Sequence, residues 1–400
     1  MVWSLARAVA CLCELTARFV STWCPRDRNL WAFGTRSDHL NDHSIYLLDD
    51  VRRSRPDVIA VWISGDGKVV DAIRATGGEA HLRWSWRGVR IALSAGAVVY
   101  TGDARDVNFA LTGGAVHVNL YHGIPLKQIE FSIETEPAHS TYHPRTWRQW
   151  LRSRVMFAPK FSRHDILAVP STWCADVMTK AFDGRVSNVV GPASPRVVPL
   201  ADPSRPSPEV LRRERELIAR ARSTASYVVL YVPTWRRTSP AVEPLPDLDA
   251  LSDVMRATDG VFLLKSHIFS PDKLSSDGRI ISVPSDYDVS AMLSGVDLLI
   301  TDYSSVFFDF ALLDRPVAFY PYDLAEYLQT ESGKFTYPYE SLLEGRSVTA
   351  PAELLEMLRT GAWRAWNLPD DLRNTVWGSE SDVVGGNQRV IEAIESELRR

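Results

Sequence analysis

The sequence predicts an α/β protein with two doubly wound domains that face a cleft. Short apolar runs rich in Val, Trp and Tyr alternate with polar, helix-like segments, which is the pattern of parallel strands buried between helices. The alternation restarts after one break rich in Pro and Ser. A chain of 400 residues also suits two cores of ordinary size better than one.

Each strand is predicted from its own apolar run. The break at 189–210, "VVGPASPRVVPLADPSRPSPEV", predicts a linker, and an Arg- and Glu-rich helix follows it at 209–222. We expect an N-terminal helix at 1–25, a first domain at 26–195 and a second at 196–400, whose C-terminal helices can return to the first domain. The predicted strands are 29–35, 57–64, 95–102 and 115–121 before the linker, and 227–233, 261–265, 279–283, 297–301 and 316–320 after it.

Composition excludes several classes of protein. Apolar residues at 45% and charged residues at 24% indicate a soluble globular chain. The net charge of −4 gives no general attraction to nucleic acid, so any contact with a polyanion must be local, and no nucleic-acid partner is predicted. The four cysteines have neither zinc nor redox spacing, which predicts free thiols in a reducing compartment.

The first 23 residues predict an amphipathic helix, with Arg7, Glu14 and Arg18 on one side. These charges interrupt the apolar run, so neither a signal peptide nor a membrane span is predicted. Two interpretations stay open: a helix packed on the first domain, or a helix lying in a membrane interface. The apolar side carries Leu5, Val9, Leu12, Phe19 and Trp23.

Ligands of doubly wound sheets bind at the carboxyl ends of the strands, so the residues that follow each strand are site candidates. His122-Gly123-Ile124-Pro125-Leu126-Lys127 follows the strand at 115–121. His122 can accept a proton near neutral pH, Gly123 permits a tight turn, and Lys127 can neutralise a phosphate. The alternative is a strand-end histidine that hydrogen-bonds to backbone.

Three strand ends of the second domain carry further candidates for holding a donor and its phosphates. Thr234 and Arg236 follow one strand, where a forked guanidinium can bind phosphate oxygens. Lys265 ends the next strand, and His267 follows it after Ser266. Each of these residues can equally belong to a solvated turn.

The strongest local signal is "DLLITDYSSVFFDFALLDRP" at 297–316. Thr301 ends a strand that runs into Asp302, Ser304 and Ser305, and a helix start with two hydroxyls suits a diphosphate. Asp309, one turn into that helix, can bind ribose hydroxyls. Simple capping of the helix explains one of these polar residues but not the set.

No metal or dinucleotide cofactor is predicted. The chain lacks the Gly-rich motifs of ATPases and dinucleotide-binding dehydrogenases. The Asp247-Leu248-Asp249 and Asp286-Tyr287-Asp288 triplets each open a helix-like segment, so capping explains them better than metal binding does.

Taken in order, these segments resemble the CDP-glycerol glycerophosphotransferase family, the teichoic-acid primases and polymerases. The resemblance covers most of 29–360 and is most specific in its last segment. The segments that carry it are "FGTRSDHLNDHSIYL", "YHGIPLK", "LYVPTWR", "LLKSH" and "TDYSSVFFDFALLDRPVAFYPYDLAEY".

The resemblance implies a GT-B fold of two Rossmann-like domains, with the donor nucleotide mainly in the second. It implies that an acceptor hydroxyl attacks the β-phosphorus of CDP-glycerol and releases CMP. His122 falls on the family's catalytic histidine and is assigned as the general base, while His267 supports the transferred phosphate. The negative charge on that phosphate is expected to be stabilised by Arg236, Lys265 and the Ser304-Ser305 turn, without a metal.

The chain departs from the family pattern at three places, and these bear on the identity of the donor's alcohol group more than on the type of reaction. Gly191 to Arg196 is two residues longer than the family's Gly-x-Pro-Arg. Glu331-Ser332-Gly333-Lys334 stands where an Arg-Gly pair is expected, and Glu344-Gly345-Arg346 where Pro-Gly-Pro is expected. The alternatives are therefore a transferase for CDP-ribitol or a nucleotide sugar, and a catalytically silent binding protein of the same fold.

A basic and aromatic stretch at 141–165 is either a solvated helix face or a surface for anionic lipid or a phosphate-rich acceptor. With the N-terminal helix, it leads us to expect a cytoplasmic enzyme that lies peripherally on the inner face of the cell membrane. Its expected partners are a CDP-activated polyol, a lipid-linked or polysaccharide acceptor, and an anionic membrane surface.

Overall fold

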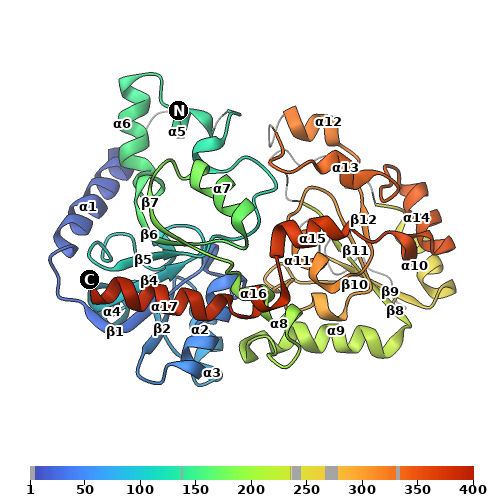
Figure 1. Cartoon of the computed structure of the whole chain (residues 1–400), viewed down its shortest axis with the longest axis horizontal. Helices are drawn as coiled ribbons and strands as arrows, with labels where there is room; N and C mark the ends of the chain where they lie inside the picture. The colour runs from blue at the N-terminus through green and yellow to red at the C-terminus, as the bar shows by residue number, and fades with distance from the viewer. Residues whose placement is uncertain (1–4, 137, 235, 237–244, 266–277, 330–333) are drawn as a thin grey trace. The chain divides into compact units, whose positions relative to one another are not determined.

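The computed structural model describes residues 5–136, 138–234, 236, 245–265, 278–329 and 334–400 (Figure 1). The chain divides into two compact units. Unit 1 comprises Met1–His122, Ile129–Val210 and Trp377–Arg400, and unit 2 comprises Gly123–Gln128 and Leu211–Val376. The last 24 residues therefore belong to unit 1, and a six-residue segment after His122 belongs to unit 2.

Unit 1 is built on a parallel sheet of seven strands in the order β3-β2-β1-β4-β5-β6-β7. The four strands expected from apolar runs are present. Three more, β3, β6 and β7, are short or begin with polar residues, so their patterns were too weak to single out. The strands are β1 (Asp27–Phe33), β2 (Ile59–Ser64), β3 (Glu79–Leu82), β4 (Ala95–Tyr100), β5 (Val116–Asn119), β6 (His164–Ala168) and β7 (Val186–Val190).

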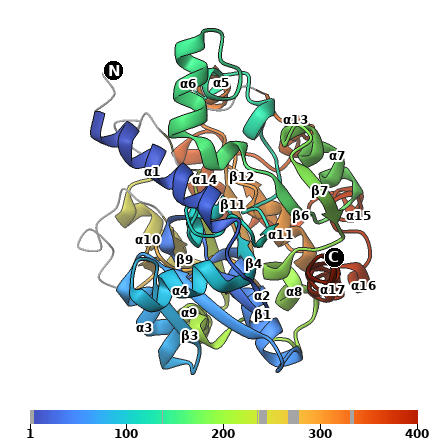
Figure 2. The same cartoon turned by 90° about the vertical axis from the view of Figure 1, so that its left-hand side faces the viewer.

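The helices of unit 1 cover this sheet, and the C-terminal helix α17 lies against β4 to β7 (Figure 1). α1 packs beside α6 (Figure 2). The helices are α1 (Leu5–Ser21), α2 (Asp42–Ser54), α3 (Gly67–Ala75), α4 (Trp86–Ser94), α5 (His139–Tyr142), α6 (Trp147–Met156), α7 (Thr172–Ala181), α8 (Val198–Ala201), α16 (Glu380–Val384) and α17 (Gly386–Arg399).

Unit 2 has a parallel sheet of five strands in the order β10-β9-β8-β11-β12, as its five apolar runs predict. Its core gathers inward-facing strand residues with side chains of α10 and α14. The strands are β8 (Tyr227–Val232), β9 (Gly260–Leu264), β10 (Ile280–Ser282), β11 (Leu298–Thr301) and β12 (Val317–Phe319). The helices are α9 (Arg212–Thr224), α10 (Leu248–Ala257), α11 (Val306–Phe310), α12 (Leu324–Tyr327), α13 (Tyr339–Leu343), α14 (Pro351–Thr360) and α15 (Asp370–Trp377), whose last residue falls in unit 1.

Each sheet has one topological switch point, where the strand order reverses. In unit 1 the reversal lies between β1 and β4, and in unit 2 it lies between β8 and β11. Doubly wound sheets bind their ligands in the crevice at such a point, outside the carboxyl ends of the strands. The residues that follow these four strands, and β5 next to β4, are therefore placed to form sites.

Candidate active site

His122 lies at the carboxyl edge of the unit 1 sheet, three residues after β5 ends. Its Nδ1 is 3.1 Å from the carbonyl oxygen of Thr101, which directly follows β4. A carbonyl oxygen only accepts hydrogen bonds, so Nδ1 carries the proton and Nε2 presents the lone pair. The imidazole also stacks on the Tyr121 ring, with centroids 4.1 Å apart. The backbone hydrogen bond of the alternative interpretation is thus present, and it leaves the lone pair of the ring on Nε2.

Two arginines that were not among the predicted site residues contact His122. Arg196 donates from Nη1 to the carbonyl oxygen of His122 at 3.0 Å and forms an ion pair with Asp42 at 2.8 Å. Arg36, in the turn after β1, places its Nη1 3.2 Å from His122 Nε2. The sequence contained a signal for both. Arg36 lies in the "FGTRSDHLNDHSIYL" segment, and Arg196 ends the segment that departs from the family pattern.

The electrostatic surroundings hold His122 neutral. Burial lowers the pKa of its imidazole to about 3, and the Arg36 charge contributes next. The hydrogen bond to Thr101 opposes this shift, while Arg196 and Lys160 add to it. The pKa of an unperturbed histidine is about 6.5. The ring is therefore unprotonated throughout the neutral range.

At the carboxyl edge of the unit 2 sheet, the polar residues surround one buried carboxylate, that of Asp302. Asp302 follows β11 and is fully buried. Its carboxylate accepts a hydrogen bond from the Thr234 backbone N–H at 2.8 Å and forms an ion pair with Arg236 Nη2 at 2.8 Å. Arg236 Nε also donates to Asp323 at 2.8 Å. Burial alone would lower the pKa of Arg236, but hydrogen bonds to Asp323 and Asp302 raise it above its ordinary value. In this structure the Arg236 fork is occupied by carboxylates, and it joins the turns that follow β8 and β11.

The remaining residues of the 301–309 segment differ in what they present. Thr301 Oγ1 is buried and donates to the carbonyl oxygen of Val232 at 2.6 Å, and Asp309 lies in the core at 1% exposure. Ser304 and Ser305 are half-buried before α11. Ser305 is the N-cap residue, and its side chain makes no capping hydrogen bond. The Ser304 hydroxyl accepts a hydrogen bond from the Val306 backbone N–H at 3.4 Å, so capping accounts for part of its role.

Two predicted phosphate contacts have protein partners. Lys265 Nζ donates to the carbonyl oxygens of Pro284, Ser285 and Tyr287 at 3.0, 3.3 and 2.9 Å. Lys127 Nζ donates to the Tyr327 hydroxyl at 2.6 Å. Gly123 directly follows His122 and is half-buried, and His267 lies outside the described residues. The described part of the chain holds no group of three His, Cys, Asp or Glu side chains placed to bind a metal.

Capping accounts for Asp247 in the first acidic triplet. Its carboxylate accepts hydrogen bonds from the backbone N–H groups of Asp249 and Ala250, at the start of α10. In the second triplet, Asp288 is buried and accepts from the Ala291 backbone N–H at 2.9 Å. The cysteines Cys11, Cys13, Cys24 and Cys174 are free thiols.

Comparison with known proteins names the family. The family described as CDP-glycerol:poly(glycerophosphate) glycerophosphotransferase matches residues 17–376. The chain belongs to this family. The resemblance drawn from its motifs is thereby confirmed.

Curated relatives of this glycerophosphotransferase family member carry teichoic-acid names. It is 27% identical over 255 residues to a teichoic acid glycerol-phosphate transferase of Staphylococcus aureus, which is 61% of each protein. It is 29% identical over 209 residues to a teichoic acid glycerol-phosphate primase of Bacillus subtilis, 51% of each. It is also 31% identical over 188 residues to the S. aureus ribitol-phosphate polymerase TarK, 45% of this chain and 36% of that one. The aligned regions thus span less than two thirds of these relatives.

The fold is shared with a solved family structure. The wall teichoic acid polymerase TagF superposes with a TM-score of 0.71 at 21% identity, covering 100% of this chain and 99% of that chain. This likeness concerns the fold alone. It confirms the prediction of a GT-B-like fold made of two Rossmann-like α/β domains.

Proposed function

We propose that the chain transfers glycerol phosphate from CDP-glycerol to a hydroxyl of a lipid-linked or glycan acceptor. The acceptor oxygen forms a bond to the β-phosphorus, the bond from that phosphorus to CMP breaks, and CMP leaves. His122 Nε2 takes the proton of the acceptor hydroxyl. The observation that carries this proposal is His122 itself: a neutral imidazole with its tautomer set by Thr101, at the switch-point edge of a glycerophosphotransferase family member.

The donor is assigned to unit 2. Ser304 and Ser305 offer hydroxyls beside the start of α11, and the buried Thr234 hydroxyl has no partner among the described residues. Such donors suit diphosphate oxygens. In this proposal Arg236 and Asp302 hold the site in shape, Asp309 and Thr301 support it from the core, and Lys265 supports the loop at 284–287. His267 is assigned to the transferred phosphate.

CDP-ribitol is the second candidate donor, because the relatives include proteins named ribitol-phosphate polymerases at 29% and 31% identity. Glycerol and ribitol differ in the alcohol and not in the bond that breaks. Both candidates therefore use His122 in the same way. A nucleotide sugar and a catalytically silent protein remain the alternatives from other classes.

The test is release of nucleotide from CDP-glycerol, CDP-ribitol and UDP- or GDP-sugars, with a lipid-linked glycan extract as the acceptor and parallel reactions in EDTA. We expect CMP from CDP-glycerol, at a rate that EDTA leaves unchanged. Release from CDP-ribitol alone would replace the donor and keep the reaction. CDP-glycerol binding without release from any donor would contradict the assignment as an enzyme.

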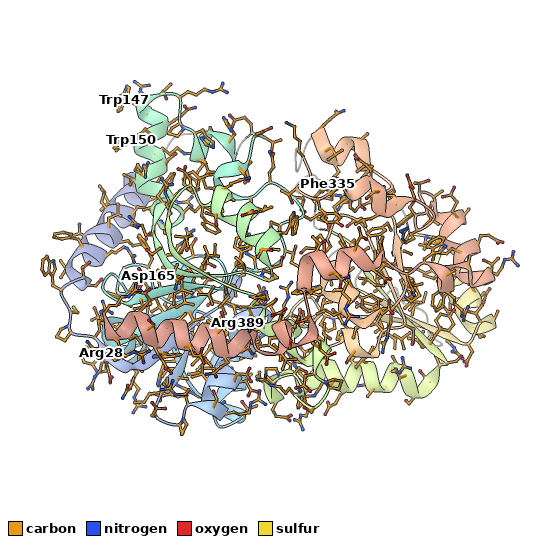
Figure 3. All side chains as sticks on the ribbon, viewed as in Figure 1. Arg28, Trp147, Trp150, Asp165, Phe335 and Arg389 are labelled. Atoms are coloured by element: carbon orange, nitrogen blue, oxygen red, sulfur yellow. The ribbon has the colours of Figure 1, made fainter. Side chains whose placement is uncertain are left out.

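We further propose that unit 1 lies on an anionic membrane through a surface formed by α1 and α6. The exposed large apolar side chains in the described residues are concentrated on α1, on α6 and in segment 82–86. Trp23 is 78% exposed and Trp147 is 70% exposed. Figure 3 shows Trp147 and Trp150 on the outer side of α6. The members of the α1–α6 surface are Val9, Leu12, Phe19 and Val20 on α1, Trp23 just after α1, and Trp147, Trp150 and Leu151 on α6.

The orientation of α1 supports this proposal. Its Arg18 points into unit 1, donating to the Phe109 carbonyl oxygen at 2.9 Å, so the C-terminal end of its polar side faces the protein. The apolar side borders a hollow of about 530 Å³ that Leu93 and Leu111 also line. Apolar residues bordered by arginines suit the interface of an anionic bilayer. No helix in the described ranges is both long and apolar enough to span a bilayer.

Replacing Trp147 and Trp150 by Ala is expected to weaken binding to phosphatidylglycerol-containing vesicles at least about tenfold, because two interfacial aromatic side chains are lost. Co-sedimentation measures the partition coefficient. Ile59→Ala, which removes an exposed apolar side chain elsewhere on unit 1, is the matched control. Equal binding of both proteins, or binding that is insensitive to salt and to anionic lipid, would contradict the proposed surface.

A further inference from the structure

Arg36 contacts the lone pair that the proposed reaction needs. Its guanidinium Nη1 lies 3.2 Å from His122 Nε2, the ring atom that carries no proton when Nδ1 donates to Thr101. A guanidinium only donates hydrogen bonds, so it occupies the lone pair. While this contact persists, Nε2 cannot accept a proton from a substrate hydroxyl. The proposed general base is therefore masked by Arg36 in this structure.

The Arg36 side chain is exposed and makes few contacts, although its backbone is held. Arg36 is exposed, and His122 is the one described residue that its guanidinium contacts. Its backbone N–H donates to Thr101 Oγ1 at 3.3 Å. Two residues on, Asp38 accepts a hydrogen bond from the Gly65 N–H at 2.7 Å and pairs with Arg83. An arginine without a carboxylate partner, on a turn fixed at a switch point, is suited to an incoming anion.

The other cations near His122 have partners that hold them. Arg196 is paired with Asp42, and Lys160 lies 3.6 Å from Glu130. His43 is buried, and its burial lowers its pKa, so it is neutral near pH 7. Among the described residues, Arg36 is thus the charged group beside Nε2 whose departure breaks no ion pair. The groups facing the imidazole are Arg36, Arg196, Lys160, His43 and the Tyr121 ring.

We propose that Arg36 is a positioning residue that masks His122 in the unliganded enzyme and moves its hydrogen bonds to a phosphate oxyanion of the substrate. The exchange is favourable, because a guanidinium binds a phosphate through two charge-assisted hydrogen bonds and a neutral imidazole through one. Binding of substrate then exposes Nε2 at the moment when an acceptor hydroxyl is present. This inference rests on the proposed function and adds to it a residue that couples phosphate binding to the base.

The first experiment needs no turnover. In protein labelled with 13C at histidine Cε1, the His122 signal is assigned by its loss in His122→Asn, and its pKa is read by NMR titration without substrate. Removing a neighbouring positive charge favours protonation of the ring, so Arg36→Met should raise the His122 pKa by at least about one unit. Arg52→Met should leave it unchanged, because Arg52 lies on α2 and, among the described residues, its side chain donates to the Gly77 carbonyl oxygen alone. An unchanged pKa in Arg36→Met would overturn the masking contact.

The same signal identifies the phosphate. CDP-glycerol and glycerol 3-phosphate are added separately to wild type and to Arg36→Met. The compound whose phosphate binds Arg36 is expected to shift the His122 signal of the wild-type protein. The same compound should leave the His122 signal of Arg36→Met in place. A response to CDP-glycerol assigns the donor diphosphate, and a response to glycerol 3-phosphate alone assigns the acceptor. No response to either, at concentrations that bind, would overturn the exchange.

Kinetics give the second readout. In wild type, the acidic limb of the plot of kcat/KM against pH should lie at a pH well below the usual imidazole pKa. In Arg36→Met, this limb should move to higher pH as the His122 pKa rises. In Arg36→Met, the KM for the phosphate-bearing substrate should increase about tenfold. Arg36→Lys should show a smaller increase, because lysine keeps the positive charge. A uniform loss of kcat with no movement of the limb would indicate a merely structural role. If wild type releases no CMP, the proposed function fails, while the NMR titration still decides the Arg36 contact.

Discussion

His122→Asn is expected to lower kcat/KM for CMP release about 10³-fold, the largest effect we predict on activity. Asn can still donate to the Thr101 carbonyl oxygen in place of Nδ1, so the turn after β5 keeps its contact. It has no group in the place of Nε2, and the loss of a general base costs between about 10² and 10⁴ in rate. Steady-state CMP release over pH 5 to 9, with the acceptor extract present, measures the loss.

The control is His81→Gln, on β3 at the edge of the same sheet, where the imidazole contacts Glu79. This variant should retain the wild-type rate. Binding of CDP-glycerol to His122→Asn should stay within about threefold of wild type, because the donor is assigned to unit 2. A His122→Asn enzyme with more than about a tenth of wild-type kcat/KM would exclude His122 as the base.

Arg236→Met is expected to destabilise unit 2 by about 3–5 kcal/mol, the largest effect we predict on stability. Asp302 is fully buried, and within the described ranges Arg236 is the cation paired with it. Removing the guanidinium leaves an uncompensated buried carboxylate. Hydrogen exchange followed by mass spectrometry, on peptides that cover β8 and β11, measures the change within unit 2.

Two comparisons separate this cause from a general loss of packing. Arg359→Met removes an ion pair of unit 2 with Glu356 in which both side chains are more than half exposed, and it should cost less than about 1 kcal/mol. Adding Asp302→Asn to Arg236→Met should recover part of the stability, because the fully buried carboxylate is then replaced by a neutral amide. A cost for Arg236→Met equal to that of Arg359→Met would contradict the role assigned to the Asp302 ion pair.

Local patterns were enough to place His122. A β-branched and aromatic run forms β5, the run ends before a glycine and a proline, and a parallel sheet presents the next residues at its carboxyl edge. The same reasoning placed Asp302 after β11 and Thr234 after β8. These predictions needed only the alternation of strands and helices, because each depends on residues that are neighbours in the chain. β6 and β7 were not singled out, since their residues "HDILA" and "VSNVV" alternate too weakly.

The partners of these residues were decided by the tertiary structure. Arg236 has the same donors whether it binds a phosphate or a carboxylate, and pairing with Asp302 follows from the hydrogen bonding of β8 beside β11, strands that lie far apart in the sequence. In the same way, Arg36 reaches His122 because the strand order places β4 between β1 and β5. The sequence by itself determined the fold class, the family and the edge at which the polar groups appear. Only the folded sheet decided which charges meet there, because Coulomb and hydrogen-bond energies depend on distance in space, which spacing along the chain does not specify.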